Sequence, residues 1–322
     1  MSIVNFNTSY ATMNLGDFII VDAIHEEMKF LFDCDFVYEL STHTPVATFY
    51  QCLTKTKSMA ACDNAKYKFI DGTNILKRSL LHLCPGWNIN IANCRPYKGS
   101  ILIGVGLDGD FKTPNLYTSI IYKKVLSQKY AHSTRDEKTK KMLESLGYKA
   151  INTGCPTLWK LTRDFCKGIP HDKADRVVFT LTDYCKDQTH DQMLINILKE
   201  NYKEVLFWIQ GSNDLKYFNS LNNTDNIKLI PPNLASYEKI LEEGNIDYVG
   251  TRLHAGIFAM RHKIRSIILI VDNRAKDMKE SYNLVAVERD QTDKLKKMIK
   301  SSFETDIRID EDKINKWKAQ FK

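Results

Sequence analysis

The sequence predicts an α/β protein made of two successive Rossmann-like lobes that face one another across a cleft. Short β-rich apolar runs alternate with longer segments of helical periodicity along the chain, which is typical of βα units that feed a mainly parallel sheet. A length of 322 residues is enough for about two domains of ordinary size. The periodicity also breaks from position 151 onward, and a fresh series of strands follows the break.

In the first lobe, we expect strands where apolar runs end in turn residues and helices where apolar residues recur at helical spacing. Asn14 is expected to cap the first helix, and Gly147 to end the last one. The predicted strands are 2–7, 35–41, 66–72, 100–107 and 130–133, and the predicted helices are 15–32, 116–128 and 135–147.

The second lobe repeats this rhythm after the polar stretch that ends near position 175. The predicted strands are 176–183, 204–211, 226–232, 246–250 and 264–272, and the predicted helices are 234–244, 252–262 and at least one closing helix. We place the lobes at residues 1–165 and 166–322, with the final helix a candidate to pack back on the first lobe. Open parallel sheets bind ligands beyond the carboxyl ends of their strands, so the site is expected there.

Composition narrows the classes of partner. Hydrophobic residues make up 43% and charged residues 26%, which is typical of a globular protein. The start "MSIVNFNTSYATMNLGDF" has no basic head or cleavage site, so we expect a cytoplasmic protein, with attachment to the inner face of the membrane left open. Eight scattered cysteines without CxxC pairs predict reduced, mostly buried thiols and no metal site.

The net charge of +7 favours anionic partners, namely phosphorylated metabolites, anionic lipid surfaces or nucleic acid. Nucleic acid is not expected, because no module signature for it occurs. Lysines crowd into "DKLKKMIKSS" and "EDKINKWKAQFK", but acidic residues interrupt them at helical spacing, which favours solvated helix faces.

The stretch "GTRLHAGIFAMRHK" at 250–263 contains the strongest candidate site. If a helix begins near Thr251, Arg252 and His254 lie in its first turn, where free backbone N–H groups and the helix dipole attract an anion. Arg252 could hold an oxyanion in bidentate fashion, and His254 could donate a proton near neutral pH. The structural alternative is that both side chains cover a neighbouring loop.

A second candidate is Arg135 in "AHSTRDEKTKKML", at the same kind of strand-to-helix corner in the first lobe. The two arginines, Arg135 and Arg252, could therefore face each other across the cleft. Thr134 with Glu137 fits a capping box, so a helix start is also expected here. The alternative is that neighbouring acidic groups pair with Arg135.

The third candidate is "NLGDFIIVDAI", where Asn14 caps a helix and Gly16 permits close approach of the backbone. Asp17 falls in the first helical turn, where the helix dipole stabilises a carboxylate. That carboxylate is also well placed to accept a proton from a substrate hydroxyl. By contrast, "GVGLDG" fits G-x-G-x-x-G only by spacing, because Pro114 interrupts and no helix follows directly.

Together these motifs resemble the polysaccharide pyruvyltransferase family. The most specific pieces are N-x-G-D near the start, S-x-R-D in the middle and R-L-H-A late, and the resemblance extends from about position 10 to 275. Two departures are "FIDGTNIL", which has a single glycine, and "TGCPTLW", where Cys155 stands in place of an acidic residue. The resemblance implies a GT-B-like fold, with the acceptor on the first lobe and the donor on the second.

The family resemblance also implies a reaction. Such enzymes transfer a pyruvyl group from phosphoenolpyruvate to a sugar, usually as a ketal bridging two hydroxyls, and release phosphate. Carried over, Arg135, Arg252, Leu253 and His254 would form the donor site, with Leu253 acting through its backbone. His254 becomes the acid and Asp17 the base, and no cofactor or metal is implied.

The implied acceptor is a sugar of a surface polysaccharide, such as a capsule or exopolysaccharide, or its lipid-linked precursor. Two alternatives remain. One is a GT-B glycosyltransferase with a nucleotide-sugar donor, for which only Asp183 or Glu238 offers a ribose partner. The other is a non-catalytic binding protein of the same fold, whose signature would have been loss of the arginines or the histidine.

Overall fold

The computed structural model describes residues 2–81, 87–109 and 112–321. The chain divides into two compact units. Unit 1 comprises Met1–Thr12, Ile20–Trp159 and Asp310–Lys322, and unit 2 comprises Met13–Ile19 and Lys160–Ile309. Within the described ranges, no helix is long and apolar enough to cross a membrane.

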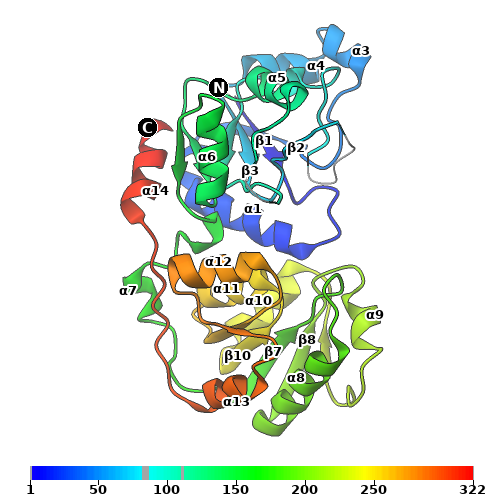
Figure 1. Cartoon of the computed structure of the whole chain (residues 1–322), viewed down its shortest axis with the longest axis vertical. Coiled ribbons are helices and arrows are strands. Elements are labelled where there is room, and N and C mark those ends of the chain that lie inside the picture. Colours follow the sequence, from blue (N-terminus) through cyan, green and yellow to red (C-terminus); the bar gives the residue numbers. More distant parts are fainter. Residues whose placement is uncertain (1, 82–86, 110–111, 322) are drawn as a thin grey trace. The chain divides into compact units, whose positions relative to one another are not determined.

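Unit 1 is built on parallel strands in the order β2-β1-β3-β4 (Figure 1). Strands β5 and β6 pair with each other, and a bridge between Val105 and Thr134 links them to the segment after β4. The order places the topological switch point between β1 and β3, where connections run to opposite sides.

The strands of unit 1 are β1 (Ser2–Asn7), β2 (Phe36–Ser41), β3 (Tyr67–Asp71), β4 (Ile101–Ile103), β5 (His132–Thr134) and β6 (Ala150–Asn152). Its helices are α1 (Leu15–Glu27, which begins in unit 2), α2 (Lys29–Phe32), α3 (Phe49–Leu53), α4 (Lys57–Asn64), η1 (Arg95–Tyr97), α5 (Leu116–Val125), α6 (Glu137–Ser145), η2 (Pro156–Leu158), α14 (Glu311–Lys318) and η3 (Ala319–Phe321).

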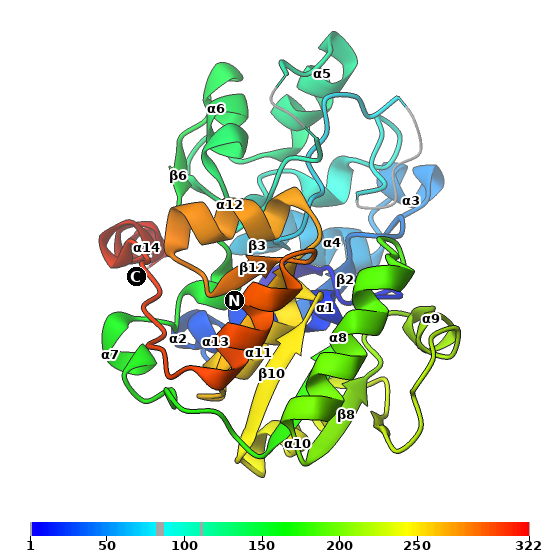
Figure 2. The same cartoon turned by 60° about the horizontal axis from the view of Figure 1, so that its bottom comes forward.

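Unit 2 contains a six-stranded parallel sheet in the order β12-β11-β10-β7-β8-β9. Counted from β7, this is the 3-2-1-4-5-6 order of a Rossmann fold read from the other edge, with the switch point between β7 and β10. All residues of β10 and β11 are buried, as expected for central parallel strands covered on both faces. In Figure 2, β10 and β8 are seen with α8 and α13 in front of them.

The strands of unit 2 are β7 (Arg176–Thr180), β8 (Glu204–Trp208), β9 (Lys228–Ile230), β10 (Ile246–Gly250), β11 (Ser266–Ile270) and β12 (Ala286–Glu288). Its helices are α7 (Arg163–Cys166), α8 (Gln188–Asn201), α9 (Asp214–Phe218), α10 (Leu234–Glu242), α11 (Leu253–Arg261), α12 (Asn273–Tyr282) and α13 (Thr292–Lys300).

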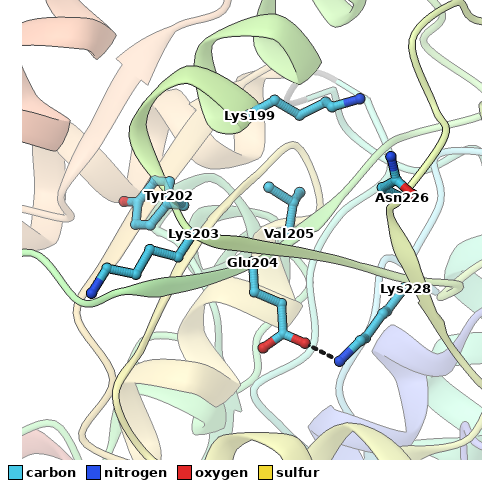
Figure 3. Close-up of a pocket in the computed structure, with 7 residues that line it drawn as sticks. All are labelled: Lys199, Tyr202, Lys203, Glu204, Val205, Asn226 and Lys228. Carbon is cyan, nitrogen blue, oxygen red and sulfur yellow. Dashed lines mark hydrogen bonds and ion pairs between the residues drawn. The ribbon is translucent and has the colours of Figure 1, made fainter.

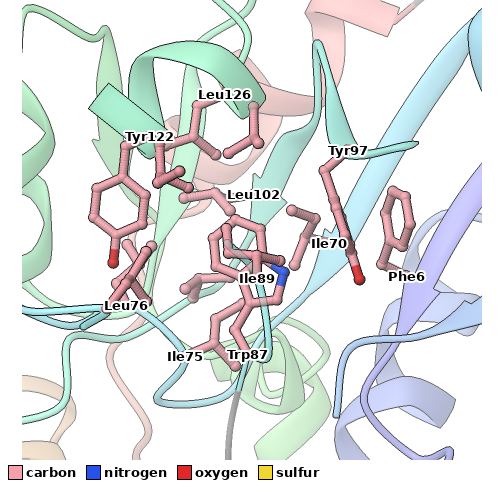
Figure 4. Close-up of a cluster of buried hydrophobic side chains, with 14 of the residues drawn as sticks. Phe6, Ile70, Ile75, Leu76, Trp87, Ile89, Tyr97, Leu102, Tyr122 and Leu126 are labelled. Atoms are coloured by element: carbon pink, nitrogen blue, oxygen red, sulfur yellow. The ribbon is translucent and has the colours of Figure 1, made fainter. Parts of the chain in front are cut away.

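Each unit has its own hydrophobic core. In unit 1, Phe6 of β1 and Ile70 of β3 pack with Trp87, Tyr97 and Tyr122 (Figure 4). A second cluster in unit 2 joins β7, β8, β10 and β11 to α8 and α13. Two separate cores confirm the prediction of two lobes of α/β type.

Most predicted elements are present, but four details are wrong. The predicted helix 15–32 is interrupted at Met28, whose backbone angles (φ −106°, ψ 11°) separate α1 from α2. The strand predicted at 100–107 is limited to β4. The supposed break at 151 begins with a strand, β6. Finally, Asp136 rather than Thr134 caps α6, because Thr134 ends β5 and its hydroxyl donates to the carbonyls of Asp136 and Ile151.

The cysteines are free thiols at the seven described positions, and Cys84 lies outside the described residues. Four of the seven are buried: Cys52, Cys62, Cys155 and Cys166. Trp87 and Trp208 are fully buried in the cores of the two units, so neither is available to stack on a ligand.

Candidate functional site

The candidate site of unit 2 lies at the carboxyl ends of β7, β8 and β10, around the switch point of the sheet. Thr182 and Asp183 follow β7, Gln210 and Gly211 follow β8, and Arg252 follows β10. Since parallel strands all end at the same edge, residues separated by up to seventy positions in sequence converge here. Hydrogen bonds confirm the convergence: the Thr182 and Thr251 hydroxyls lie 2.8 Å apart.

Arg252 is the centre of this edge and is almost completely buried. Its Nε donates to the carbonyl of Leu181 at 3.0 Å and to Asp214 Oδ2 at 3.1 Å. Its Nη2 donates to Asp214 Oδ1 and, at 2.9 Å, to Asp183 Oδ1. The Tyr184 ring lies against the guanidinium, 5.0 Å from ring centroid to Cζ. Two carboxylates and an aromatic face therefore fix its orientation.

The two carboxylates differ in burial. Asp214 is fully buried, whereas the side chain of Asp183 is 19% exposed. Burial raises the pKa of Asp214, although its pair with Arg252 opposes the rise. Burial by itself would lower the pKa of Arg252, but the Asp214 carboxylate outweighs this and the pKa is raised. Asp214 is thus the fixed counterion, and Asp183 is the partner that an incoming anion could displace.

The N-x-G-D segment joins the same edge. Asn14 pairs with Gly211 in an antiparallel bridge, Leu15 N donates to the carbonyl of Gln210 at 3.0 Å, and Gln210 Nε2 donates to Asn14 Oδ1 at 2.8 Å. Asn14 Oδ1 also accepts from Gly16 N at 3.1 Å, which confirms that Asn14 caps the first helix. A β-carbon on Gly16 would lie 3.0 Å from Gln210 Nε2, so the Gln210 side chain packs tightly over the glycine.

Gly211 connects this segment to Arg252. A β-carbon at Gly211 would overlap Arg252 Nη2, and Gly211 N donates to Asp214 Oδ2 at 2.7 Å. The turn at 210–214 therefore contacts the N-x-G-D segment on one side and the arginine on the other. Asp17, in the first turn of α1, is buried in unit 2 as well.

Helix α11 presents its first turn at this edge. Arg252 is its N-cap residue, and the Arg252 side chain makes no capping hydrogen bond to the helix. Leu253 and His254 are the first two helical residues, and both are buried. An α-helix of this length carries uncapped N–H groups and a positive dipole end, which together favour a bound anion.

Arg135 lies at the corresponding edge of unit 1, after β5. Its Nη2 donates to Asn74 Oδ1, its Nε lies 3.8 Å from Asp136 Oδ2, and its backbone N–H donates to the Val105 carbonyl at 3.0 Å. A β-carbon at Gly106 would come within 2.6 Å of Arg135 Nη2. The glycine of "GVGL" thus lets the guanidinium pack on the backbone, which sequence reasoning did not foresee.

A polar cluster at the switch point of unit 1 was also missed. Asn5 Nδ2 donates to Asp71 Oδ2 at 2.9 Å and to Glu39 Oε2 at 3.1 Å, and His25 Nε2 lies 3.2 Å from Glu39 Oε1. Burial, reinforced by the nearby Glu39, raises the pKa of Asp71 to about 8, while the hydrogen bond to Glu39 raises that of His25. The signal was Asp71 itself, an acid at the carboxyl end of the buried strand β3.

A basic hollow of about 450 Å³ at the opposite, amino ends of β8 and β9 is a competing anion site (Figure 3). Its lysines are already engaged: Lys228 pairs with Glu204, Lys203 lies 3.1 Å from Asp175, and Lys199 donates to the Asn223 carbonyl at 3.1 Å. The hollow therefore lacks the buried, fixed cation found at the switch point.

The two acids considered for a nucleotide ribose are both occupied. Asp183 pairs with Arg252, and Glu238 on α10 lies 3.3 Å from His262 Nε2. Glu238 belongs to a helix surface and its side chain is 45% exposed.

Fold and site together define a two-lobed α/β protein of GT-B-like architecture. UDP-GlcNAc 2-epimerase of Methanocaldococcus jannaschii, solved with UDP-GlcNAc and UDP, superposes with a TM-score of 0.51 at 12% identity over 97% of this chain and 96% of that one. The structure is also similar to E. coli heptosyltransferase WaaC, with a TM-score of 0.40 and 11% identity over 84% of this chain and 88% of that one. A third similar structure is S. aureus MnaA with UDP, with a TM-score of 0.46 and 10% identity over 94% and 91% of the two chains. At 12% identity, the likeness to the epimerase of M. jannaschii shows the fold alone.

The family is shown by sequence. A family model described as polysaccharide pyruvyl transferase matches residues 14–273, most of the chain, whereas no curated protein matches it. The match begins at Asn14 of the N-x-G-D motif and includes the R-L-H segment. The chain belongs to the polysaccharide pyruvyl transferase family.

Proposed function

We propose that this protein transfers a pyruvyl group from phosphoenolpyruvate to a sugar of a surface polysaccharide, or of its lipid-linked precursor, forming a ketal and releasing phosphate. The observation that carries the proposal is the meeting of two family motifs on one turn. Asn14 of N-x-G-D and Arg252 of R-L-H both contact Gly211, at the switch point of the sheet. Neither motif needs this arrangement for its local structure, so a shared ligand is the simplest reason for it.

The site suits a small dianion. Phosphoenolpyruvate carries a carboxylate and a phosphate, and the first turn of α11, which the Arg252 side chain does not cap, would offer the backbone N–H of Leu253 and the positive end of the helix dipole to one of them. Arg252 would bind the other anionic group of phosphoenolpyruvate. Its ion pair with Asp183 would be replaced by one with the ligand, and its ion pair with Asp214 would remain. Arg135 of unit 1, held by Asn74, is our candidate for the second arginine of the donor site.

The reaction balances with the residues at hand. His254 would protonate the methylene carbon of the enol, and an acceptor hydroxyl would add to the neighbouring carbon, giving its proton to Asp17. The bond from this carbon to the phosphate oxygen then breaks, and phosphate leaves with that electron pair; the proton held by Asp17 passes to it through solvent, so that it departs as hydrogen phosphate and Asp17 is restored. A second acceptor hydroxyl adds to the same carbon and closes the ketal, and its proton restores the acid. Asn14 and Gly16 would hold the acceptor near Asp17.

The first test is isothermal titration of the protein with phosphoenolpyruvate, UDP-glucose and UDP. We expect binding of phosphoenolpyruvate alone, and at least tenfold weaker binding by Arg252→Lys and His254→Gln, which both spare the buried counterion. Lys203→Ala, in the hollow of Figure 3, is the matched control and should bind normally.

Activity is measured as phosphate released from phosphoenolpyruvate in the presence of candidate sugars. Conversion of Asp17 to Asn should abolish release without weakening donor binding. Binding of UDP-glucose instead of phosphoenolpyruvate would contradict the proposal and favour a nucleotide-sugar glycosyltransferase. Binding without turnover on any sugar would favour a non-catalytic member of the fold.

A further inference from the structure

The net positive charge of this chain comes from one segment, because basic and acidic residues nearly balance in the rest. Residues 42–134 contain twelve lysines and arginines but only four acidic residues, whereas the rest of the chain contains 34 basic and 35 acidic residues. Of the four acids, Asp63 lies 2.6 Å from Arg95, Asp108 lies 2.8 Å from Lys77, and Asp71 is fully buried. The net charge of +7 therefore belongs to this part of unit 1 and not to the molecule as a whole.

The same segment exposes large apolar side chains. On α3, Tyr50 is 74% and Leu53 67% exposed, and Phe49 is exposed beside them. On α5, Leu116 is 79% exposed and Ile120 lies one turn further along the same helix face. Exposed single apolar residues are common, but a group of this size on neighbouring elements marks an interaction surface.

Hydrogen bonds connect the two helices through the loop that contains residues 91–95. Tyr117 Oη on α5 accepts from Ile91 N at 3.3 Å, and the loop after the exposed Ile91 leads to Arg95. Arg95 Nη1 in turn donates to the carbonyls of Cys52 (2.5 Å) and Thr54 (3.0 Å), at the end of α3.

Lysines flank the apolar residues on both helices. Lys55 follows α3 and Lys57 begins α4, while Lys123 and Lys124 lie at the end of α5, one turn beyond Ile120; all four are exposed. No acidic residue occurs between positions 42 and 62 or between 112 and 134. We call the exposed residues of α3 and α5, with Ile91 and these four lysines, the α3–α5 face.

We propose that the α3–α5 face docks on a membrane surface that carries anionic lipids. Apolar and aromatic side chains that protrude from separate elements can enter the headgroup region, while lysines beside them bind lipid phosphates. Interfaces between proteins usually have a polar rim of mixed charge, whereas here the exposed lysines have no acidic counterpart except Asp63, which pairs with Arg95 at 2.6 Å. The inference is independent of the donor chemistry proposed above.

The test is co-sedimentation of the full chain with vesicles of phosphatidylcholine alone and of phosphatidylcholine with phosphatidylglycerol. We expect binding to the anionic vesicles, at least tenfold stronger than to neutral ones and weakened by salt. Two variants, Leu116→Ser/Ile120→Ser and Lys123→Gln/Lys124→Gln, should each lower the partition coefficient at least fivefold. The matched control is Lys297→Gln/Lys300→Gln on α13, which removes two exposed lysines elsewhere and should bind normally.

Three outcomes would overturn the proposal: equal binding to neutral and anionic vesicles, no binding to either, or full binding by both α5 variants. Light scattering of the protein without vesicles gives a fourth such outcome. If the protein does not bind vesicles but forms a dimer, and Leu116→Ser/Ile120→Ser dissociates that dimer, the face serves self-association. The lysine variant keeps the test decisive if the apolar variant fails to fold. Titration with phosphoenolpyruvate should be unchanged in both, which separates this surface from the donor site.

Discussion

Replacing Asp71 with asparagine is expected to stabilise the protein at neutral and alkaline pH. Asp71 is fully buried, one of its carboxyl oxygens accepts from Asn5, and the other has no hydrogen-bond partner among the described residues. Burial and the neighbouring Glu39 raise the pKa of Asp71 from 3.8 to about 8. An asparagine has nearly the same shape and offers an N–H donor where a protonated carboxyl would offer its O–H.

The size of the effect follows from proton linkage. Below pH 3.8 Asp71 is protonated in both the folded and the unfolded state, so it does not affect stability. Between this value and the folded pKa of about 8, only the unfolded state ionises, and stability falls by about 1.4 kcal/mol per pH unit. The penalty therefore reaches about 4 kcal/mol at pH 7 and levels off near 6 kcal/mol above pH 8, as an upper limit.

Urea unfolding at pH 4.5, 7.0 and 8.5 measures this directly. Asp71→Asn should gain about 2–4 kcal/mol over the natural protein at pH 8.5 and less than about 1 kcal/mol at pH 4.5. The matched control is Asp247→Asn. Asp247 is equally buried but pairs with Arg265 at 2.7 Å, so its loss leaves an unpaired buried charge. This variant should lose about 3–5 kcal/mol at pH 7.

The reasoning is refuted if Asp71→Asn destabilises the protein by the same amount at pH 4.5 and pH 8.5. Such a result would mean that Asp71 is ionised and stabilising in the folded state.

Three further predictions concern the arginine sites. Gly211→Ala should lower the affinity for phosphoenolpyruvate at least tenfold in titrations, because the added carbon displaces Arg252; unchanged affinity would separate that turn from the donor site. Gly106→Ala should reduce the rate of phosphate release at least tenfold by displacing Arg135, and a change confined to thermal unfolding would make that arginine structural. Asp183→Asn should strengthen binding of phosphoenolpyruvate several-fold, because it removes the carboxylate that competes with the ligand for Arg252. Weaker binding would contradict the proposal that the ligand displaces Asp183 from Arg252.

Several elements could be predicted because their own residues encode them. The strands 2–7 and 246–250 coincide with β1 and β10, since a short β-rich apolar run bounded by polar or turn residues has few other stable choices. Gly147 follows the end of α6, as expected, and has a positive φ of 87°. The place of Arg252 and His254 at the start of α11 also follows from local sequence.

Other elements were missed or misplaced because the deciding contacts are distant. Helices α8 and α12 went unrecognised, although Asp187 and Asp272 cap them in the ordinary way. The short strand β6 exists because its partner β5 supplies the hydrogen bonds that three residues cannot make alone. Likewise, only its buried surroundings raise the pKa of Asp71, which looks in sequence like any other aspartate.

By itself, the sequence determined the α/β class, the two lobes, the family motifs and the residue types that we propose for an anion site. Periodicity, caps and turns report burial and hydrogen bonding over a few neighbouring residues, and the motifs are local as well. The tertiary structure alone decided that β10 lies beside β7, so that Arg252 meets Asp183 and Asp214, and that Asn14 pairs with Gly211. Which strands become neighbours depends on the packing of the whole sheet, and no local pattern specifies it.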